Sequence, residues 1–344
     1  MHISEFDYEL PEDLIAQEPL PERDASRMLV LDRKRGTWSD STFSELIQYL
    51  RPSDLVVINN TRVIPARLIG KRTPSGGRVE ILLVRELDTN IWEALVRPGQ
   101  RLKRGSEVEF GGGRLSAEIL DQPGKELRQV RFFCEGSFDA LLNEIGVTPL
   151  PPYIRRISGT SAKDVDRYQT IFSRNPGAIA APTAGLHFTP QMLSAVRDRA
   201  NLVEITLHVG YGTFEPVRVE EIEEHSVSPE RVEISKPSAE MINAARDRRG
   251  RVIAIGTTTM RALESAVSEQ GEVRHGETTA KLTIKPGYRF RVADALLTNF
   301  HLPRSSLLLL VCAFAGQNLV LDAYRHSVAA RYRFYSYGDC MLIV

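Results

Sequence analysis

The sequence contains few cysteines, and their spacing argues against two common ways of stabilising a fold. Cys134, Cys312 and Cys340 are an odd number, lie far apart and form no Cys-x-x-Cys pair. A disulfide framework needs paired cysteines, and a thiolate zinc site needs closely spaced ones. We therefore expect the three thiols to be small buried hydrophobic groups.

Long apolar runs are also missing. The longest one, Leu307 to Ala315, is far too short to cross a bilayer. The N-terminal residues Met1 to Tyr8 are acidic and lack the basic and apolar regions of a signal peptide. These features predict a cytoplasmic protein that does not associate with a membrane.

Neither sign of charge is in excess, because 44 basic residues balance 44 acidic ones. Basic residues nevertheless cluster at Arg97 to Arg104 (RPGQRLKR), at Arg155-Arg156 and at Arg246 to Arg251 (RDRRGR). Such clusters are either solvated surface or contacts to nucleic-acid phosphates, since a phosphate footprint depends on local rather than total charge. Composition leaves both interpretations open.

Residues 67–150 have the pattern of a small β domain. Short β-like runs, broken by glycine and proline, occur at 78–84, 91–96, 106–110, 114–120 and 128–133. Their spacing is typical of a small barrel or sandwich. A short helix at 138–144 and the prolines of 149–152 close the segment. We predict an inserted β-barrel domain over 67–150.

The rest of the chain alternates predicted strands and helices. Strands are expected at 55–58, 178–181, 202–208, 252–255, 295–298 and 341–344. Helices are expected after the N-caps Thr189 and Ser305 and over 237–249, 260–268 and 319–330. Alternation of this kind implies a layered sheet. The predicted fold class is therefore α/β, with residues 1–66 and 151–344 forming a catalytic domain of mixed sheet and helices.

Polar side chains, glycines and imidazoles follow the predicted strands. Ligands of open α/β sheets gather at the carboxyl ends of strands, so these residues predict one pocket. The catalytic candidates are His187, His208, His301 and Glu224. The substrate-binding candidates are Asn59, Asn60, Arg62, Thr183, Gly185, Gly210, Gly212, Thr213, Thr257, Thr258, Arg261, Asn299, Tyr337 and Asp339.

Each group has a structural alternative. The threonines after Gly256 either help a helix N-terminus bind a carboxylate or phosphate, or one of them simply caps the helix. The histidines are structural, catalytic or metal ligands, but no His-x-x-x-His spacing appears, so no metal is predicted. Glu224, beside His225, is either a base or part of a solvated loop. The aromatics around Tyr337 either pack in the core, stack on a base or face a sulfonium.

Six longer motifs carry a family resemblance. They are NNTRVIPARL (59–68), APTAGLHFT (181–189), TLHVGYGTFEPV (206–217), VIAIGTTTMRALES (252–265), DALLTNFHLPRSSLLLLVCAFAG (294–316) and YRFYSYGDCMLI (332–343). In this order they resemble the S-adenosylmethionine:tRNA ribosyltransferase-isomerase family of queuosine biosynthesis. The chain departs from the family at Ala280-Lys281-Leu282-Thr283-Ile284 and Lys285, where the family has Thr-Asp-Leu-Phe-Ile and Tyr. The segment after Glu224 (HSVSPERVEI) also matches the family's pattern less well than the six motifs do.

The resemblance implies an enzyme whose acceptor is tRNA carrying 7-aminomethyl-7-deazaguanine in the anticodon. It implies S-adenosylmethionine as the ribosyl donor, no further cofactor, and adenine, methionine and epoxyqueuosine-tRNA as products. We expect a monomer. In this chemistry the histidines would share acid and base roles, with His187 as the first choice for base. Thr257, Thr258 and Arg261 would hold the methionine carboxylate or ribose. Asn59, Asn60, Arg62 and Asn299 would bind a base edge or sugar hydroxyls.

Two rival functions remain at this point. One is a non-catalytic RNA-binding protein that uses the β barrel as its reader. The other is a metal-dependent hydrolase that uses the same histidines.

Overall fold

The computed structural model describes residues 1–121, 126–156, 162–214 and 217–344. The chain forms two compact units. The first, the α/β unit, comprises Met1–Arg62, Pro152–Arg155 and Arg167–Val344. The second, the barrel unit, comprises Val63–Pro151 and Arg156–Asp166.

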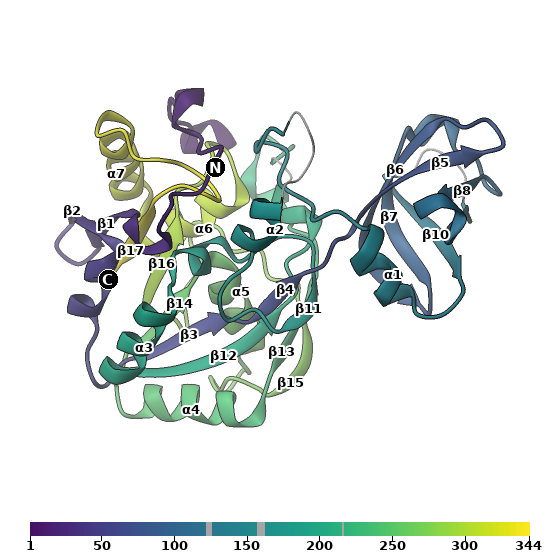
Figure 1. Cartoon of the computed structure of the whole chain (residues 1–344). Helices are drawn as coiled ribbons and strands as arrows, with labels where there is room; N and C mark the ends of the chain where they lie inside the picture. The colour runs from purple at the N-terminus through teal and green to yellow at the C-terminus, as the bar shows by residue number, and fades with distance from the viewer. Residues whose placement is uncertain (122–125, 157–161, 215–216) are drawn as a thin grey trace. The chain divides into compact units, whose positions relative to one another are not determined.

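A nine-stranded mixed sheet forms the centre of the α/β unit (Figure 1). Its strands, in spatial order, are β15 (Gly276–Ala280), β13 (Glu230–Ile234), β12 (Asn201–Leu207), β3 (Leu55–Asn59), β14 (Val252–Ile255), β16 (Ala295–Asn299), β17 (Cys340–Ile343), β1 (Arg27–Asp32) and β2 (Thr37–Thr42). The central strands β12, β3, β14 and β16 are parallel, whereas β17 runs antiparallel to β16. The carboxyl ends of the central strands therefore meet at one edge.

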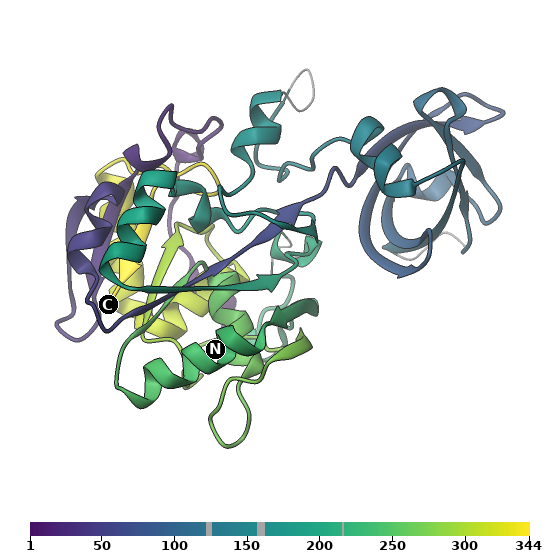
Figure 2. The same ribbon diagram turned by 60° about the horizontal axis from the view of Figure 1, so that its bottom comes forward.

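Both faces of this sheet are covered, which explains the continuous apolar runs of its central strands. Along β3, Leu55 and Val57 belong to one hydrophobic core, while Val56 and Ile58 belong to the other. The first core also contains residues of α4 (Lys236–Asp247), α5 (Thr257–Ala266), α6 (Ser306–Ala315) and α7 (Gln317–Ala329). The second contains residues of α3 (Pro190–Arg199) and the 3-10 helix η4 (Phe43–Tyr49). Figure 2 shows the layers from a second direction.

Helix capping by the predicted residues is confirmed. The Thr189 hydroxyl accepts a hydrogen bond from Met192 N at 3.1 Å, and Pro190 occupies the first turn of α3. The Ser305 hydroxyl accepts from Leu308 N at 3.3 Å at the start of α6. These caps fix where the loops end and the helices begin.

The barrel unit is a closed antiparallel barrel. Its strands, in order around the barrel, are β10 (Leu127–Cys134), β7 (Ile91–Arg97), β6 (Arg78–Asp88), β5 (Arg67–Thr73), β8 (Glu107–Phe110) and β9 (Leu115–Ile119). Alternate residues face the interior, as the burial of Val79, Ile81 and Leu83 along β6 illustrates. The unit also contains helix α1 (Phe138–Ile145). The predicted α/β fold with an inserted small barrel is confirmed.

Some elements differ from the prediction. Strand β5 was not expected, and it contains Gly70, where a Cβ atom would lie 2.5 Å from Phe110 Cδ1. The strand predicted at 178–181 is wrong: β11 (Asn175–Ala178) ends there and pairs with β4 (Thr61–Val63) instead. After β11 ends, Ile179 N donates a single hydrogen bond to Val209 O at 3.0 Å, and residues 179–181 belong to no strand.

Across the described residues, no single helix is long and apolar enough to cross a membrane. Only α6 and α7 taken together meet that criterion, and they are bent by 117° relative to each other.

Candidate active site

Two adjoining cavities lie where β14 and β16 end in the α/β unit. The first encloses about 540 Å³ and the second about 490 Å³, each including space open to solvent. Thr257, Thr258 and Leu307 line both. The first is also lined by Tyr153, Ala180, Ala181, Thr183, Ala184, Val209, Gly256, Thr298, Asn299, Phe300, His301, Tyr335 and Ser336. The second is also lined by Gly212, Val227, Ser228, Glu230, Arg261, Leu282, Ile284, Ser306 and Leu310.

The N-terminus of α5 faces both cavities. Gly256 adopts φ +96°, which permits the sharp turn from β14 into the helix. No side chain caps this helix. Within the described part of the chain, the buried Thr258 hydroxyl oxygen has no hydrogen-bond partner. Uncapped N–H groups and the positive end of the helix dipole make this turn suited to a ligand carboxylate or hydroxyl.

His301 is the one predicted histidine that lines a cavity. Its Nε2 lies 2.9 Å from the Thr298 hydroxyl, and only 7% of the residue is exposed. Burial lowers the pKa of His301 to about 3. The imidazole is therefore neutral near pH 7, and one of its ring nitrogens can accept a hydrogen bond.

His187 lies behind the first cavity. Its Nδ1 is 2.9 Å from the Ser26 hydroxyl, and its Nε2 is 3.3 Å from Asn299 Oδ1. Burial lowers its pKa to about 4. Since Asn299 itself lines the cavity, His187 is placed to orient that amide. The Asn299 amide nitrogen also donates to Tyr335 O at 2.9 Å.

His208 lines neither cavity. It lies beside Thr61, with its Nδ1 2.9 Å from the Thr61 hydroxyl, and burial lowers its pKa. The structure therefore does not bring the three predicted histidines into one cluster. His301 and His187 share the end of β16, whereas His208 belongs to the turn after β12.

The asparagines after β3 are committed to the sheet. Asn59 donates to Leu207 O at 2.9 Å and accepts from Leu207 N at 3.0 Å. Asn60 donates to Glu204 and accepts from Thr206. Arg62 is exposed. None of the three lines either cavity.

Arg261 lines the second cavity, but its donors are used inside the protein. Its Nη1 pairs with Glu230 Oε2 at 2.5 Å, and Nε donates to Leu282 O at 2.9 Å. Its Nη2 donates to the carbonyls of Ser228 and Ala280, both at 2.8 Å. Glu230 is fully buried as well, and its other oxygen accepts from Gly210 N at 2.8 Å. Arg261 thus fastens the cavity walls together.

Burial dominates the ionisation of this pair. Removal from water raises the pKa of Glu230, and the Arg261 guanidinium partly opposes that rise. The same burial lowers the pKa of Arg261, opposed by the Glu230 carboxylate.

The predicted glycines have different local roles. Gly185 is buried, and a Cβ atom there would lie 2.8 Å from both Phe172 Cζ and Thr170 Cγ2. Gly212 lines the second cavity, where a Cβ atom would lie 2.9 Å from Ser228. Thr183, at the start of η7 (Thr183–His187), lines the first cavity. The side chain of Thr213 lies outside the part of the chain that the structure describes.

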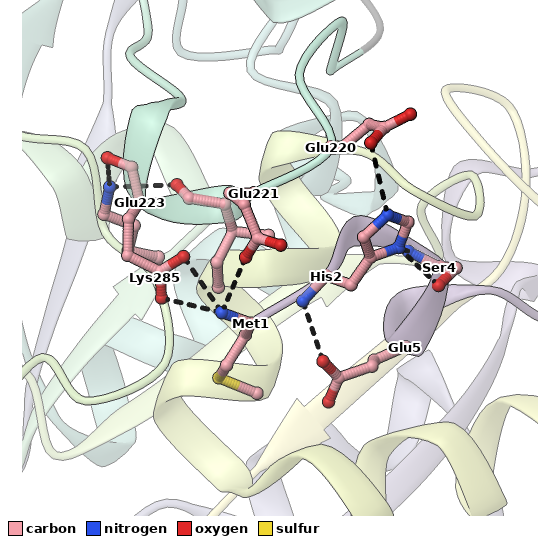
Figure 3. A network of polar contacts seen from close by, with 9 residues as sticks. Met1, His2, Ser4, Glu5, Glu220, Glu221, Glu223 and Lys285 are labelled. Atoms are coloured by element: carbon pink, nitrogen blue, oxygen red, sulfur yellow. Dashed lines mark hydrogen bonds and ion pairs between the residues drawn. The ribbon is translucent and has the colours of Figure 1, made fainter.

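Glu224 is exposed and lines neither cavity. The segment around it is fastened from two sides (Figure 3). Lys285 Nζ donates to Ile222 O at 2.9 Å and Glu223 O at 2.7 Å, and the Met1 ammonium pairs with Glu223 at 3.0 Å. The lysine at the departure from the family motif therefore has a structural role here.

The C-terminal candidates are buried behind the site. Asp339 accepts from Arg27 N at 2.9 Å and Arg333 N at 2.8 Å, and burial raises its pKa. The ring of Tyr337 packs edge-on against Tyr168. These residues hold the loop that carries Tyr335 and Ser336 into the first cavity.

Several lining residues were not predicted. Tyr335 and Ser336 belong to the same aromatic segment as Tyr337 and Asp339, but only the latter two were predicted as binding residues. Tyr153 follows the proline-rich exit of the barrel and gave no signal; its hydroxyl lies 2.6 Å from the Ser336 hydroxyl. Glu230 and Ser306 lacked a distinguishing pattern.

The arrangement of possible metal ligands in the described residues does not support a metal site. Among the described residues, no three histidine, cysteine, aspartate or glutamate side chains are grouped closely enough to hold an ion.

The fold and the cavities define an α/β enzyme whose strand-end site is lined by hydroxyl, amide and neutral imidazole groups. The family follows from comparison with known proteins. A model described as "Queuosine biosynthesis protein" matches residues 3–343. The chain belongs to this family.

Named relatives are similar over the whole chain. The chain is 50% identical to the S-adenosylmethionine:tRNA ribosyltransferase-isomerase of Pelotomaculum thermopropionicum and 47% identical to that of Halothermothrix orenii, with 100% of each chain covered. A crystal structure of S-adenosylmethionine tRNA ribosyltransferase from Thermotoga maritima is also similar. It has a TM-score of 0.56 and 39% identity, covering 99% of this chain and 100% of that one.

Proposed function

We propose that this chain is an S-adenosylmethionine:tRNA ribosyltransferase-isomerase. It transfers and isomerises the ribosyl moiety of S-adenosylmethionine onto 7-aminomethyl-7-deazaguanine at the tRNA wobble position. The products are epoxyqueuosine-tRNA, adenine and methionine. Full-length similarity to relatives with this name supports the reaction. The structural observation that carries it is the pair of adjoining cavities at the uncapped N-terminus of α5, whose largely apolar walls carry a few hydroxyl, amide and imidazole groups.

Apolar walls with a few polar groups suit a sulfonium nucleoside, which has both apolar and polar parts. The N–H groups at Thr257 and Thr258 hold the methionine carboxylate or ribose, favoured by the helix dipole. The rings of Tyr153 and Tyr335 line the other wall, where aromatic faces favour a cation. Asn299 hydrogen-bonds a base edge or sugar hydroxyl. The amides of Asn59 and Asn60 and the guanidinium of Arg261 are occupied elsewhere and have no part in this scheme.

The chemistry begins with removal of a proton from the ribose methylene beside the sulfonium, which acidifies it. We assign this step to His301 because it lines the first cavity and its imidazole is unprotonated near pH 7. His187 acts through Asn299. Adenine then leaves, the amine of the deazaguanine attacks the sugar, and rearrangement to the epoxide expels methionine. We propose no cofactor beyond S-adenosylmethionine as co-substrate, and action as a monomer in the cytoplasm.

Incubation with S-adenosylmethionine and tRNA carrying 7-aminomethyl-7-deazaguanine tests the proposal. Adenine release, measured by chromatography, should accompany the mass change of the wobble nucleoside. His301→Ala should reduce turnover at least about 100-fold, the usual contribution of a general base. His275→Ala is the matched control, since His275 is exposed and lines neither cavity. Binding of tRNA without adenine release by the wild type would instead identify a non-catalytic RNA-binding protein.

A further inference from the structure

The basic clusters at 246–251 and 97–104 differ in how many of their side chains make contacts inside the protein. In the cluster at 246–251, Arg246 donates to Gly271 O and to Arg291 O, the latter at 3.0 Å. Arg251 forms a buried ion pair with Asp54 at 2.6 Å. Of its four arginines, Arg248 and Arg249 are exposed, and so is Asp247 between Arg246 and Arg248. Two of its four arginines therefore hold the α/β unit together.

The cluster at 97–104 in the barrel unit behaves differently. We call these residues the barrel basic loop. Arg97, Arg101, Lys103 and Arg104 are all exposed. Within the described ranges, none of the four forms an ion pair. The nearest acid across the ladder from Arg97 is Glu80, which pairs with Arg67 at 3.6 Å.

A buried arginine holds this loop in shape. Arg128, only 2% exposed, pairs with Asp121 at 2.7 Å. Its Nη1 donates to Leu102 O at 3.1 Å and to Gly99 O at 3.4 Å. Leu102 is fully buried in the barrel, so the residues on either side of it point outward. Because the buried Arg128 guanidinium donates hydrogen bonds to two carbonyls of the loop, the loop backbone is ordered before any partner binds.

We propose that the barrel basic loop is a preorganised binding surface for the phosphate backbone of tRNA. This inference rests on the proposed function, which supplies the polyanion. Exposed arginines and lysines on a fixed loop bind phosphates with little loss of conformational entropy, because their backbone is already ordered. Guanidinium groups also bind phosphate oxygens in a bidentate manner. The loop positions the substrate without reading its sequence.

The test compares two charge-removal variants. The first is R97Q/R101Q, and the matched control is R248Q/R249Q, which removes the same number of exposed charges from the other cluster. The first variant should raise the KM for tRNA about tenfold at physiological salt, with kcat at saturating tRNA and the KM for S-adenosylmethionine unchanged. The slope of log Kd against log salt, from filter binding, should fall by about 0.7–0.9 for each contact removed. The control should change neither quantity.

The outcomes separate this inference from the proposed function. An unchanged KM and an unchanged salt slope in an active, folded variant overturn the loop as a binding surface and leave the function standing. An equal loss in the control variant also overturns it, because the effect would then reflect total charge. If the wild type releases no adenine, the function fails, and filter binding of tRNA still decides whether the loop binds phosphate.

Discussion

The buried Arg261–Glu230 pair gives a prediction whose size follows from the structure. Arg261→Met keeps much of the side-chain volume but removes the positive charge and all five N–H donors. Glu230 then remains buried with only the Gly210 N–H as a partner. The carbonyls of Ser228, Ala280 and Leu282 lose their donors as well. Removing one partner of a buried ion pair costs about 3–5 kcal/mol, so we expect the free energy of unfolding of the α/β unit to fall by that amount.

The pH dependence of this loss is also determined. Burial raises the pKa of Glu230 in the folded state, so its contribution to stability is present at low pH and is lost as pH rises through that pKa. Without Arg261, nothing opposes the rise except the Gly210 hydrogen bond. The destabilisation should therefore be larger near pH 8 than near pH 5, where the carboxyl is more readily protonated. Adding Glu230→Gln should recover about 1–2 kcal/mol near pH 8, because it removes the uncompensated charge.

The assay uses the distribution of tryptophans. Trp38 lies in the α/β unit and Trp92 in the barrel unit. In a Trp92→Phe background, urea unfolding followed by fluorescence reports on the α/β unit through Trp38 alone. A loss below about 1 kcal/mol, or an equal loss near pH 5 and pH 8, would refute the view that this pair is an isolated buried charge system.

Three further predictions concern packing, protonation and metals. Gly185→Ala should lower the free energy of unfolding in urea by about 1–3 kcal/mol, because the added methyl group meets Phe172 and Thr170. The control Gly77→Ala should not lower it, and equal effects of the two substitutions would contradict the packing argument. The pH profile of kcat/KM should show no limb from His301 between about pH 5 and 8, because burial lowers its pKa to about 3; a limb near pH 6.5 that His301→Gln abolishes would contradict this. Exhaustive chelator treatment should leave turnover unchanged, given the lack of grouped metal ligands in the described residues; activity lost and then restored by a divalent metal would show the reverse.

Local apolar runs were sufficient to predict the centre of the fold. Strands such as Leu55–Asn59 and Val252–Ile255 are buried on both faces, so their sequences are continuously hydrophobic. The edge strands β2 (TWSDST) and β15 (GETTA) carry no such pattern. Strand β15 forms because it pairs with the distant strand β13, as Thr278 does with Val232, and such pairing is not encoded in a local window. Strand β2 forms a hairpin with the neighbouring strand β1, and its polar residues lie on an exposed edge of the sheet.

The carboxyl-end rule placed the residues after β14 and at the end of β16 together, but residues 59–62 at the end of β3 line neither cavity, and the rule did not specify which side chains face inward. Asn59 and Asn299 both end central strands. Asn59 turns its amide toward the neighbouring strand and bridges Leu207, whereas Asn299 lines the cavity. The direction depends on the chain that follows each strand, which sequence periodicity does not specify. Tyr153 enters the site from a segment whose only sequence feature was its prolines, so long-range packing alone places it there.

The ionisation of the buried groups is compatible with the cationic donor of the proposed function. A protonated His301 or His187 would repel a sulfonium a few ångströms away by several kcal/mol at intermediate effective dielectric. Burial keeps both imidazoles neutral, and Glu230 neutralises the only guanidinium that lines the cavities within the described residues. The remaining fixed field is that of α5, whose positive end would, in the proposed function, attract the ligand carboxylate and favour a sulfonium held at a distance from it. Because Arg261 is paired with Glu230, the N-terminus of α5 is left as the source of positive potential at the proposed donor site.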